Sequence, residues 1–262
     1  MNKLISIWLT IMLASATYAQ NEVAIVGHRG ASFLAPENTL ASYNLAWELD
    51  VVAAECDIML TKDKQVILFH DKKGKRLTGV YFEVKEVYYS EIQQLSINLK
   101  ETNLEKYSNE KIPLLSEVLS SLPEGRTLVI EIKTGPEILP YLEKVIKENW
   151  KSGNIAFIAF DFETILATKE IYPQIPCYYL SAFKADLNKK FEEIKSSKLE
   201  GVNLRHNIIN KELVQKFKGI DKNVWCWTVN DPEDAKKLIT DGVTAITTDR
   251  PEWLKKAIQE NL

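Results

Sequence analysis

Five side chains in short strand-like segments have the types and spacing for acid–base chemistry around a cation. Glu55 and Asp57 are two residues apart, and Glu131 lies in a second apolar segment. In a strand, residues i and i+2 point to the same face, roughly 6.5 Å apart, so Glu55 and Asp57 project together. Converging carboxylates suit a hard divalent cation, and His28 and His70 could supply an acid and a base. These residue types indicate metal-assisted hydrolysis.

The sequence around the carboxylates supports a role inside the protein. Glu55 and Asp57 interrupt the apolar segment 51–60, and Glu131 interrupts the segment 128–132. A solvated strand face is the alternative interpretation, but charges in buried strands need partners or a metal. Three carboxylates without a thiolate ligand favour one Mg²⁺ or Ca²⁺, with Mn²⁺ as an alternative, over Zn²⁺.

Two cationic residues and a tryptophan complete the candidate site. Arg29 offers a two-pronged donor for phosphate oxygens and Lys133 a compact charge, although either could pair with an acid instead. Three carboxylates with Arg29 and Lys133 sum to −1, and a divalent cation changes the sum to +1, which attracts a monoanionic phosphodiester. Trp227 is expected near the site as an apolar wall for substrate, with an ordinary core position as the alternative.

The spacing of apolar segments predicts the fold that positions these residues. Strand-like segments alternate with helical patterns, which is typical of βα units and a parallel sheet. Eight such strands in a chain of this length predict a closed (β/α)8 TIM barrel, whose active sites lie at the carboxyl ends of the strands. An open doubly wound sheet is the alternative, but its Gly-rich fingerprint is absent. The predicted strands are 24–27, 53–59, 128–133, 156–160, 177–181, 201–204, 224–229 and 245–248.

One apolar segment, 65–70, follows the strand 53–59 too closely for a parallel connection. It therefore predicts an antiparallel hairpin, which would place His70 opposite Glu55 and Asp57. The next residues, 72–112, are interpreted as a small inserted subdomain over the barrel mouth. Within them, Ser90-Glu91-Ile92-Gln93 fits a capping box that opens a short helix.

Helical periodicity predicts the outer layer of the barrel. Pro36-Glu37-Asn38-Thr39 predicts a helix start, with acidic and amide groups at its positive end. The helical segments are 39–49, 116–122, 136–150, 163–171, 211–217 and 232–241.

Residues 1–19 have the pattern of a secretory signal: a basic start at Lys3, an apolar segment and a small-residue cleavage site. The apolar segment is short for a bilayer span, so no stable membrane anchor is expected, and a retained anchor is the alternative. We expect export to a periplasmic or secreted location, with residues 20–262 forming one domain.

The mature chain would carry a net charge of −4, because removing Lys3 leaves 32 basic against 36 acidic residues. Such a balance argues against a nucleic-acid partner. The cysteines Cys56, Cys177 and Cys226 lie in apolar segments and are expected to be buried free thiols, with one disulfide as the alternative.

In order and spacing, these motifs resemble the glycerophosphodiester phosphodiesterases. The resemblance implies a (β/α)8 barrel with an inserted subdomain and a divalent cation. It also implies hydrolysis of glycerophosphodiesters to sn-glycerol 3-phosphate and an alcohol. The motifs are His28-Arg29-Gly30, Pro36-Glu37-Asn38-Thr39, Glu55-x-Asp57, His70-Asp71 with Arg76, Glu131-x-Lys133, Ile112-Pro113, Trp227-Thr228-Val229-Asn230 and Thr248-Asp249-Arg250-Pro251.

Residue by residue, the resemblance implies metal ligands, proton carriers and substrate-binding residues. The ligands would be Glu55, Asp57 and Glu131, and the acid/base pair His28 and His70. Arg29 and Lys133 would hold phosphate, and Trp227 would contact glycerol or the leaving group. The chain departs from the family pattern at Asp50-Val51-Val52 and at Ala159-Phe160, neither of which replaces a proposed ligand or proton carrier.

Two other functions remain open at this stage. One is a lipid-directed phosphodiesterase, for which Tyr81-Phe82 and Tyr88-Tyr89 would form an apolar rim; the other is a catalytically silent binding barrel. A small-molecule glycerophosphodiester is the expected partner. The leaving alcohol, the oligomeric state, and the choice between direct water attack and a cyclic phosphate intermediate stay open.

Overall fold

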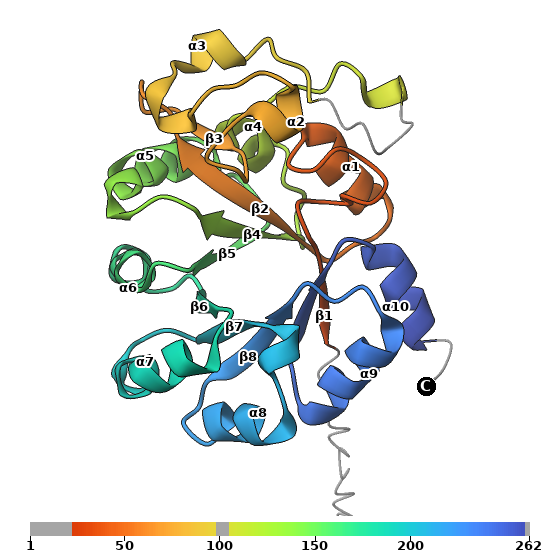
Figure 1. Ribbon diagram of the computed structural model, residues 1–262, viewed down its shortest axis with the longest axis vertical. Coiled ribbons are helices and arrows are strands. Elements are labelled where there is room, and N and C mark those ends of the chain that lie inside the picture. The colour runs from red at the N-terminus through yellow and green to blue at the C-terminus, as the bar shows by residue number, and fades with distance from the viewer. Residues whose placement is uncertain (1–22, 98–104, 260–262) are drawn as a thin grey trace, which may run out of the picture.

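The computed structural model describes residues 23–97 and 105–259 (Figure 1). The predicted signal at 1–19 lies outside the described residues. Within them, eight parallel strands form a ring in the order β1-β9-β8-β7-β6-β5-β4-β2, closed by pairing of β1 with β2. The fold is therefore a (β/α)8 barrel, and the open-sheet alternative is wrong. The strands are β1 (Ala24–Gly27), β2 (Ala53–Leu60), β4 (Thr127–Ile132), β5 (Asn154–Ala159), β6 (Cys177–Ser181), β7 (Gly201–Arg205), β8 (Asn223–Trp227) and β9 (Ala245–Thr248).

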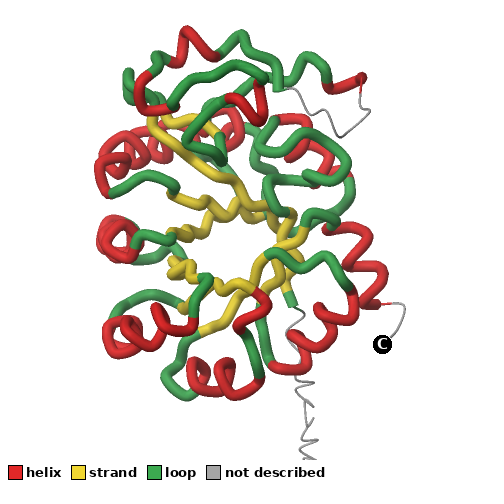
Figure 2. The backbone as a smooth tube through the Cα atoms, viewed as in Figure 1, coloured by secondary structure: helices red, strands yellow, loops and turns green. Residues whose placement is uncertain are grey.

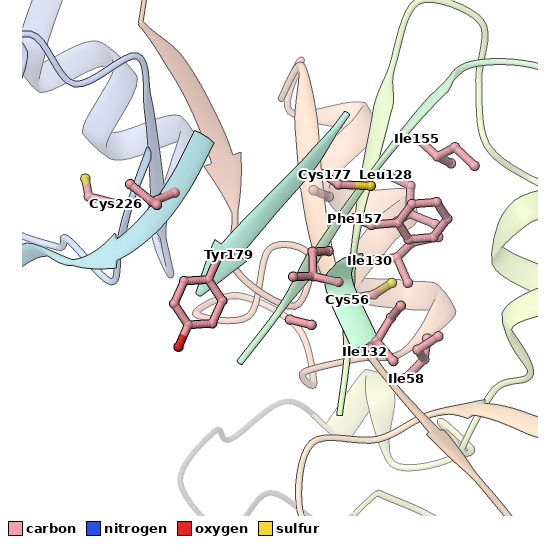
Figure 3. Close-up of a cluster of buried hydrophobic side chains, with 14 of the residues drawn as sticks. Cys56, Ile58, Leu128, Ile130, Ile132, Ile155, Phe157, Cys177, Tyr179 and Cys226 are labelled. Atoms are coloured by element: carbon pink, nitrogen blue, oxygen red, sulfur yellow. The ribbon is translucent and has the colours of Figure 1, made fainter. Parts of the chain in front are cut away.

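Successive side chains along each strand point alternately to the helix-facing core and to the inside of the barrel. Figure 3 shows Cys56, Ile58 and Ile130 in the large cluster of buried apolar side chains between strands and helices. A second cluster, which includes Val129, Tyr178 and Trp225, comes from the alternate positions and fills the inside. Since Glu55, Asp57 and Glu131 share the register of this inner set, they point into the barrel.

The predicted hairpin is confirmed. Strand β3 (Val66–Leu68) pairs antiparallel with β2, with Leu68 opposite Ile58. Next along the hairpin, the N–H of Phe69 donates a hydrogen bond to the carbonyl oxygen of Asp57 at 3.0 Å. His70 therefore follows the hairpin at the level of the β2 acids.

The inserted subdomain flanks the barrel. Its described part contains α2 (Lys75–Thr78), η1 (Val84–Glu86), α3 (Tyr89–Ile92) and η2 (Glu105–Tyr107). A small apolar cluster joins the insertion to the hairpin, with Met59, Ile67 and Phe69 among its members. In Figure 2 this part lies outside β2 and β3 and leaves the barrel centre clear. The expectation that it lies over the mouth is therefore wrong for the described residues. The apolar side of β3 gives the insertion a lateral surface to pack on.

The predicted short helix is present, but it begins one residue before Ser90. Its first residue is Tyr89, and the Glu91 carboxylate accepts the N–H of Tyr88 at 2.7 Å. The capping interaction is thus centred on Tyr88.

The helices around the barrel include all six predicted ones. Two that the periodicity did not predict are α7 and α10; α7 buries only Leu187 and Ile194, so its apolar stripe is weak. No helix among the described residues is long and apolar enough to cross a membrane. All three cysteines are free and buried, which excludes the disulfide alternative. The helices are α1 (Leu40–Glu48), α4 (Leu115–Ser120), η3 (Pro136–Ile138), α5 (Leu139–Asn149), α6 (Phe162–Ile171), α7 (Lys184–Ser196), η4 (His206–Ile208), α8 (Lys211–Lys218), α9 (Pro232–Asp241) and α10 (Pro251–Gln259).

Candidate active site

The three predicted carboxylates converge inside the barrel. Glu55 and Asp57 come from β2, and Glu131 comes from the neighbouring β4, where it stands beside Asp57 in the strand register. All three are buried, and one carboxylate oxygen of each lies within 4.8 Å of the others. Residues 74 positions apart in the sequence thus meet as the strand pattern predicts.

Burial and mutual repulsion make this cluster costly without a cation. Burial, with repulsion from Asp57 and Glu131, raises the pKa of Glu55 well above its ordinary value. Burial and the Asp57 charge raise the pKa of Glu131 to about 7. Glu55 Oε1 is buried and has no hydrogen-bond partner among the described residues. An all-oxygen donor set with an unsatisfied buried oxygen fits a hard divalent cation.

Arg29 and Lys133 face the same cluster. Arg29 Nε lies 3.1 Å from Asp57 Oδ2, and the Arg29 backbone N–H donates to Glu55 Oε2 at 3.0 Å. Lys133 Nζ lies 2.9 Å from Glu131 Oε1 and 3.5 Å from Asp57 Oδ1. Against the effect of burial, these two cations lower the pKa of Asp57. In this structure the residues predicted to hold phosphate contact the acids.

The histidines are each paired with a carboxylate. His28 Nδ1 lies 2.7 Å from Asp249 Oδ1, and His70 Nδ1 lies 2.7 Å from Asp71 Oδ1. An ionised carboxylate only accepts hydrogen bonds, so Nδ1 of each ring carries the hydrogen and Nε2 is left to accept a proton. Burial, together with the charges of Arg29 and Lys133, lowers the pKa of His70.

Asp71 and Asp249, the carboxylates paired with the two histidines, have different surroundings. Although burial opposes it, hydrogen bonds from Arg76 and His70 lower the pKa of Asp71 to about 2. Burial opposes the shift here too, but the hydrogen bond and charge of His28, together with Asn230 and Arg29, also lower the pKa of Asp249. Asn230 Nδ2 donates to the other Asp249 oxygen at 2.7 Å. Both acids are therefore ionised partners that fix the imidazole orientation.

Both histidines, both cationic side chains and two of the three acids line one pocket. Trp227 is on its wall as predicted, edge-on to Phe160 with ring centres 5.5 Å apart, and Trp227 Nε1 donates to the backbone oxygen of Asn203 at 3.2 Å. None of the described insertion residues lines this pocket. The lining consists of His28, Arg29, Glu55, His70, Glu131, Lys133, Ile158, Phe160, Leu180, Asn203, Trp227, Thr228 and Thr247.

Two residues of the predicted helix start also belong to the site. The predicted helix start is confirmed, with Thr39 as the N-cap of α1. Asn38, however, donates from Nδ2 to Asp57 Oδ2 at 2.8 Å and accepts the Asp57 N–H at 3.1 Å. Glu37 pairs with Arg29 and Arg76, each at 2.8 Å. Beyond the predicted helix start, Asn38 and Glu37 therefore hold Asp57 and Arg29 of the site.

Comparison with known proteins assigns the family. The model of the glycerophosphoryl diester phosphodiesterase family matches residues 28–253. The chain belongs to this family. It is 32% identical over 244 residues to the glycerophosphodiester phosphodiesterase of Caldanaerobacter subterraneus, covering 90% of this chain and 98% of that one. A Bacillus subtilis enzyme of the same name is 28% identical over 255 residues, covering 90% and 86%.

A solved relative has the same architecture. An Oleispira antarctica phosphodiesterase in complex with the product sn-glycerol-3-phosphate superposes with a TM-score of 0.81 at 27% identity, covering 90% of this chain and 96% of that one. The site above thus belongs to an enzyme of the glycerophosphodiester phosphodiesterase family.

Proposed function

We propose that the chain hydrolyses glycerophosphodiesters to sn-glycerol 3-phosphate and an alcohol, with His28 and His70 as proton carriers. The observation that carries this proposal is a pocket lined by two carboxylate-paired imidazoles and by Glu55 and Glu131, which form one buried cluster with Asp57. The product named for the Oleispira antarctica relative supports the choice of substrate.

Glu55, Asp57 and Glu131 would hold a divalent cation, Mg²⁺ or Ca²⁺, with Mn²⁺ as an alternative. When bound, such a cation supplies Lewis-acid stabilisation of charge on phosphoryl oxygens. It would also compete with Arg29 and Lys133 for the acids, which leaves these two side chains to hold phosphate oxygens.

The histidines divide the proton transfers. One Nε2 accepts the proton of the nucleophile, which is water or the glycerol 2-hydroxyl. The phosphorus–oxygen bond to the leaving alcohol breaks, and the other imidazolium gives that alcohol its proton. Where the 2-hydroxyl is the nucleophile, water then opens the cyclic phosphate at its bond to O2, with the histidines in exchanged roles, and sn-glycerol 3-phosphate results. The lowered pKa of His70 favours its neutral form at pH 7, which suits the accepting role.

A direct test incubates the purified protein with a panel of glycerophosphodiesters and each of Mg²⁺, Ca²⁺ and Mn²⁺, with glycerol 3-phosphate as the readout. We expect release of glycerol 3-phosphate and an equal amount of alcohol. Tight binding of the diesters in calorimetry with no product from any combination would favour a silent binding barrel instead.

Asp249→Asn is expected to lower kcat about 100-fold or more with little change in melting temperature. The change removes the charge that holds the Nδ1–H tautomer of His28 and stabilises its imidazolium. Steady-state kinetics on glycerophosphocholine measure the effect, and Asp241→Asn, on the outer helix α9, is the matched control. Equal kcat for both variants would contradict the positioning role of Asp249.

Cation affinity is expected to weaken as the pH falls below about 7. Without a cation Glu131 has a pKa of about 7, so below that pH its carboxyl is protonated and the cation must displace the proton. Titration calorimetry with Ca²⁺ at pH 5.5, 6.5 and 8.0 in two buffers would report affinity and proton release. Constant affinity without proton release at the lower pH values would count against Glu131 as a ligand.

A further inference from the structure

The pocket contains a polar side chain that the mechanism above does not use. Asn203, on β7, has only 1% of its surface exposed and lines the pocket. Its Oδ1 has no hydrogen-bond partner among the described residues. Buried amide oxygens are nearly always paired, so an unpaired one on a substrate pocket indicates a partner that arrives with the substrate.

Asn203 lies across the barrel from the acid cluster. In the ring order, β7 is four strands from β2 in either direction, and Figure 1 shows the two strands on opposite sides. Thr247 of β9 is also buried and lines the same pocket. Inner apolar side chains fill the rest of the barrel, so the pocket that Asn203 and Thr247 share with Glu55 and Glu131 is the space open to a ligand. A phosphate held at the acids would therefore extend one of its substituents toward this polar wall.

The two ends of the substrate differ in chemistry. Glycerol is common to all glycerophosphodiesters and carries two free hydroxyls, whereas the alcohol varies. Asn203 is deeply buried, which suits the constant part. Phe160 is 44% exposed and packs edge-on against Trp227, which suits a variable group at the rim.

We propose that Asn203 binds a hydroxyl of the glycerol moiety and so selects glycerol-containing diesters, with Thr247 as part of the same polar wall. This inference rests on the proposed function. A hydroxyl both donates and accepts, so it can pair with either end of the amide. A substrate without that hydroxyl would leave the buried amide unpaired, and sites built in this way discriminate strongly.

If the proposal is right, replacing Asn203 weakens ligand binding without lowering the stability of the protein. Asn203→Leu replaces an unsatisfied buried amide with an apolar side chain of similar shape, so the melting temperature should stay the same or rise. If the amide had a purely structural role, the melting temperature of the variant would fall instead.

The test is calorimetric titration of the full chain, in the presence of Ca²⁺, with sn-glycerol 3-phosphate and with propyl phosphate, which lacks both hydroxyls. Wild type should prefer glycerol 3-phosphate by about tenfold or more. Asn203→Leu should lose that preference by weakening glycerol 3-phosphate alone. Asn149→Leu, on the outer helix α5, is the matched control and should behave as wild type.

Three outcomes would overturn the inference: unchanged affinity of Asn203→Leu for glycerol 3-phosphate, equal weakening for both phosphates, or a clear fall in melting temperature. Failure of the proposed function is seen separately, in the wild type. In that case the wild type releases no glycerol 3-phosphate from any diester.

Discussion

Replacing His70 by alanine is expected to lower kcat about 10²–10⁴-fold while the barrel stays folded. The imidazole lies on the pocket wall, with Nδ1 held by Asp71 and Nε2 free to accept a proton. Its removal takes away one proton transfer and leaves the acid cluster in place. His28→Ala should have an effect of the same size, since each imidazole serves one side of the reaction.

Steady-state kinetics, circular dichroism and Ca²⁺ titration of each variant would check this prediction. The third histidine, His206, starts η4 and does not line the pocket, so His206→Ala is the matched control and should retain activity. A rate near that of wild type for either His28→Ala or His70→Ala would reject the acid/base assignment.

Removal of divalent cations by exhaustive chelation is expected to reduce the rate by about 10³-fold or more. Without a cation, no Lewis acid at the acid cluster stabilises the charge on the phosphoryl oxygens. Arg29 and Lys133 also stay paired with Asp57 and Glu131. Adding Mg²⁺, Ca²⁺ or Mn²⁺ back should restore activity in a saturable way.

Comparing Glu131→Gln with Glu137→Gln separates loss of a cation ligand from the loss of one negative charge. Glu131→Gln should weaken Ca²⁺ binding about 10-fold or more and shift the rate curve to higher cation concentration. Glu137→Gln, in η3 just after β4, is the control and should leave the curve unchanged. Full activity after chelation, or an unchanged Ca²⁺ titration for Glu131→Gln, would remove the cation or this ligand from the mechanism.

The strands and the acid cluster could be predicted because both have local signals. A carboxylate that interrupts a buried strand is costly, so Glu55, Asp57 and Glu131 stand out against their apolar neighbours. The hairpin follows from a connection too short for a parallel return, and it accounts for the placement of His70.

Contacts between distant segments have no such signal. Asp249 and His28 are 221 residues apart, and only the pairing of β9 with β1 brings them together. Asn38 and Glu37 look like an ordinary helix start, yet they bind Asp57 and Arg29. Arg29 has a φ of 54°, in the left-handed region, and its N–H donates to Glu55 Oε2. Tertiary packing determines these details.

A crystal structure of the full chain with Ca²⁺ and sn-glycerol 3-phosphate would test the central claim most directly. We expect a single ion in contact with carboxylate oxygens of Glu55, Asp57 and Glu131, and Nε2 of both His28 and His70 directed at the phosphate. An ion bound elsewhere, a Glu131 carboxylate outside its coordination, or either imidazole turned away from the phosphate would contradict it.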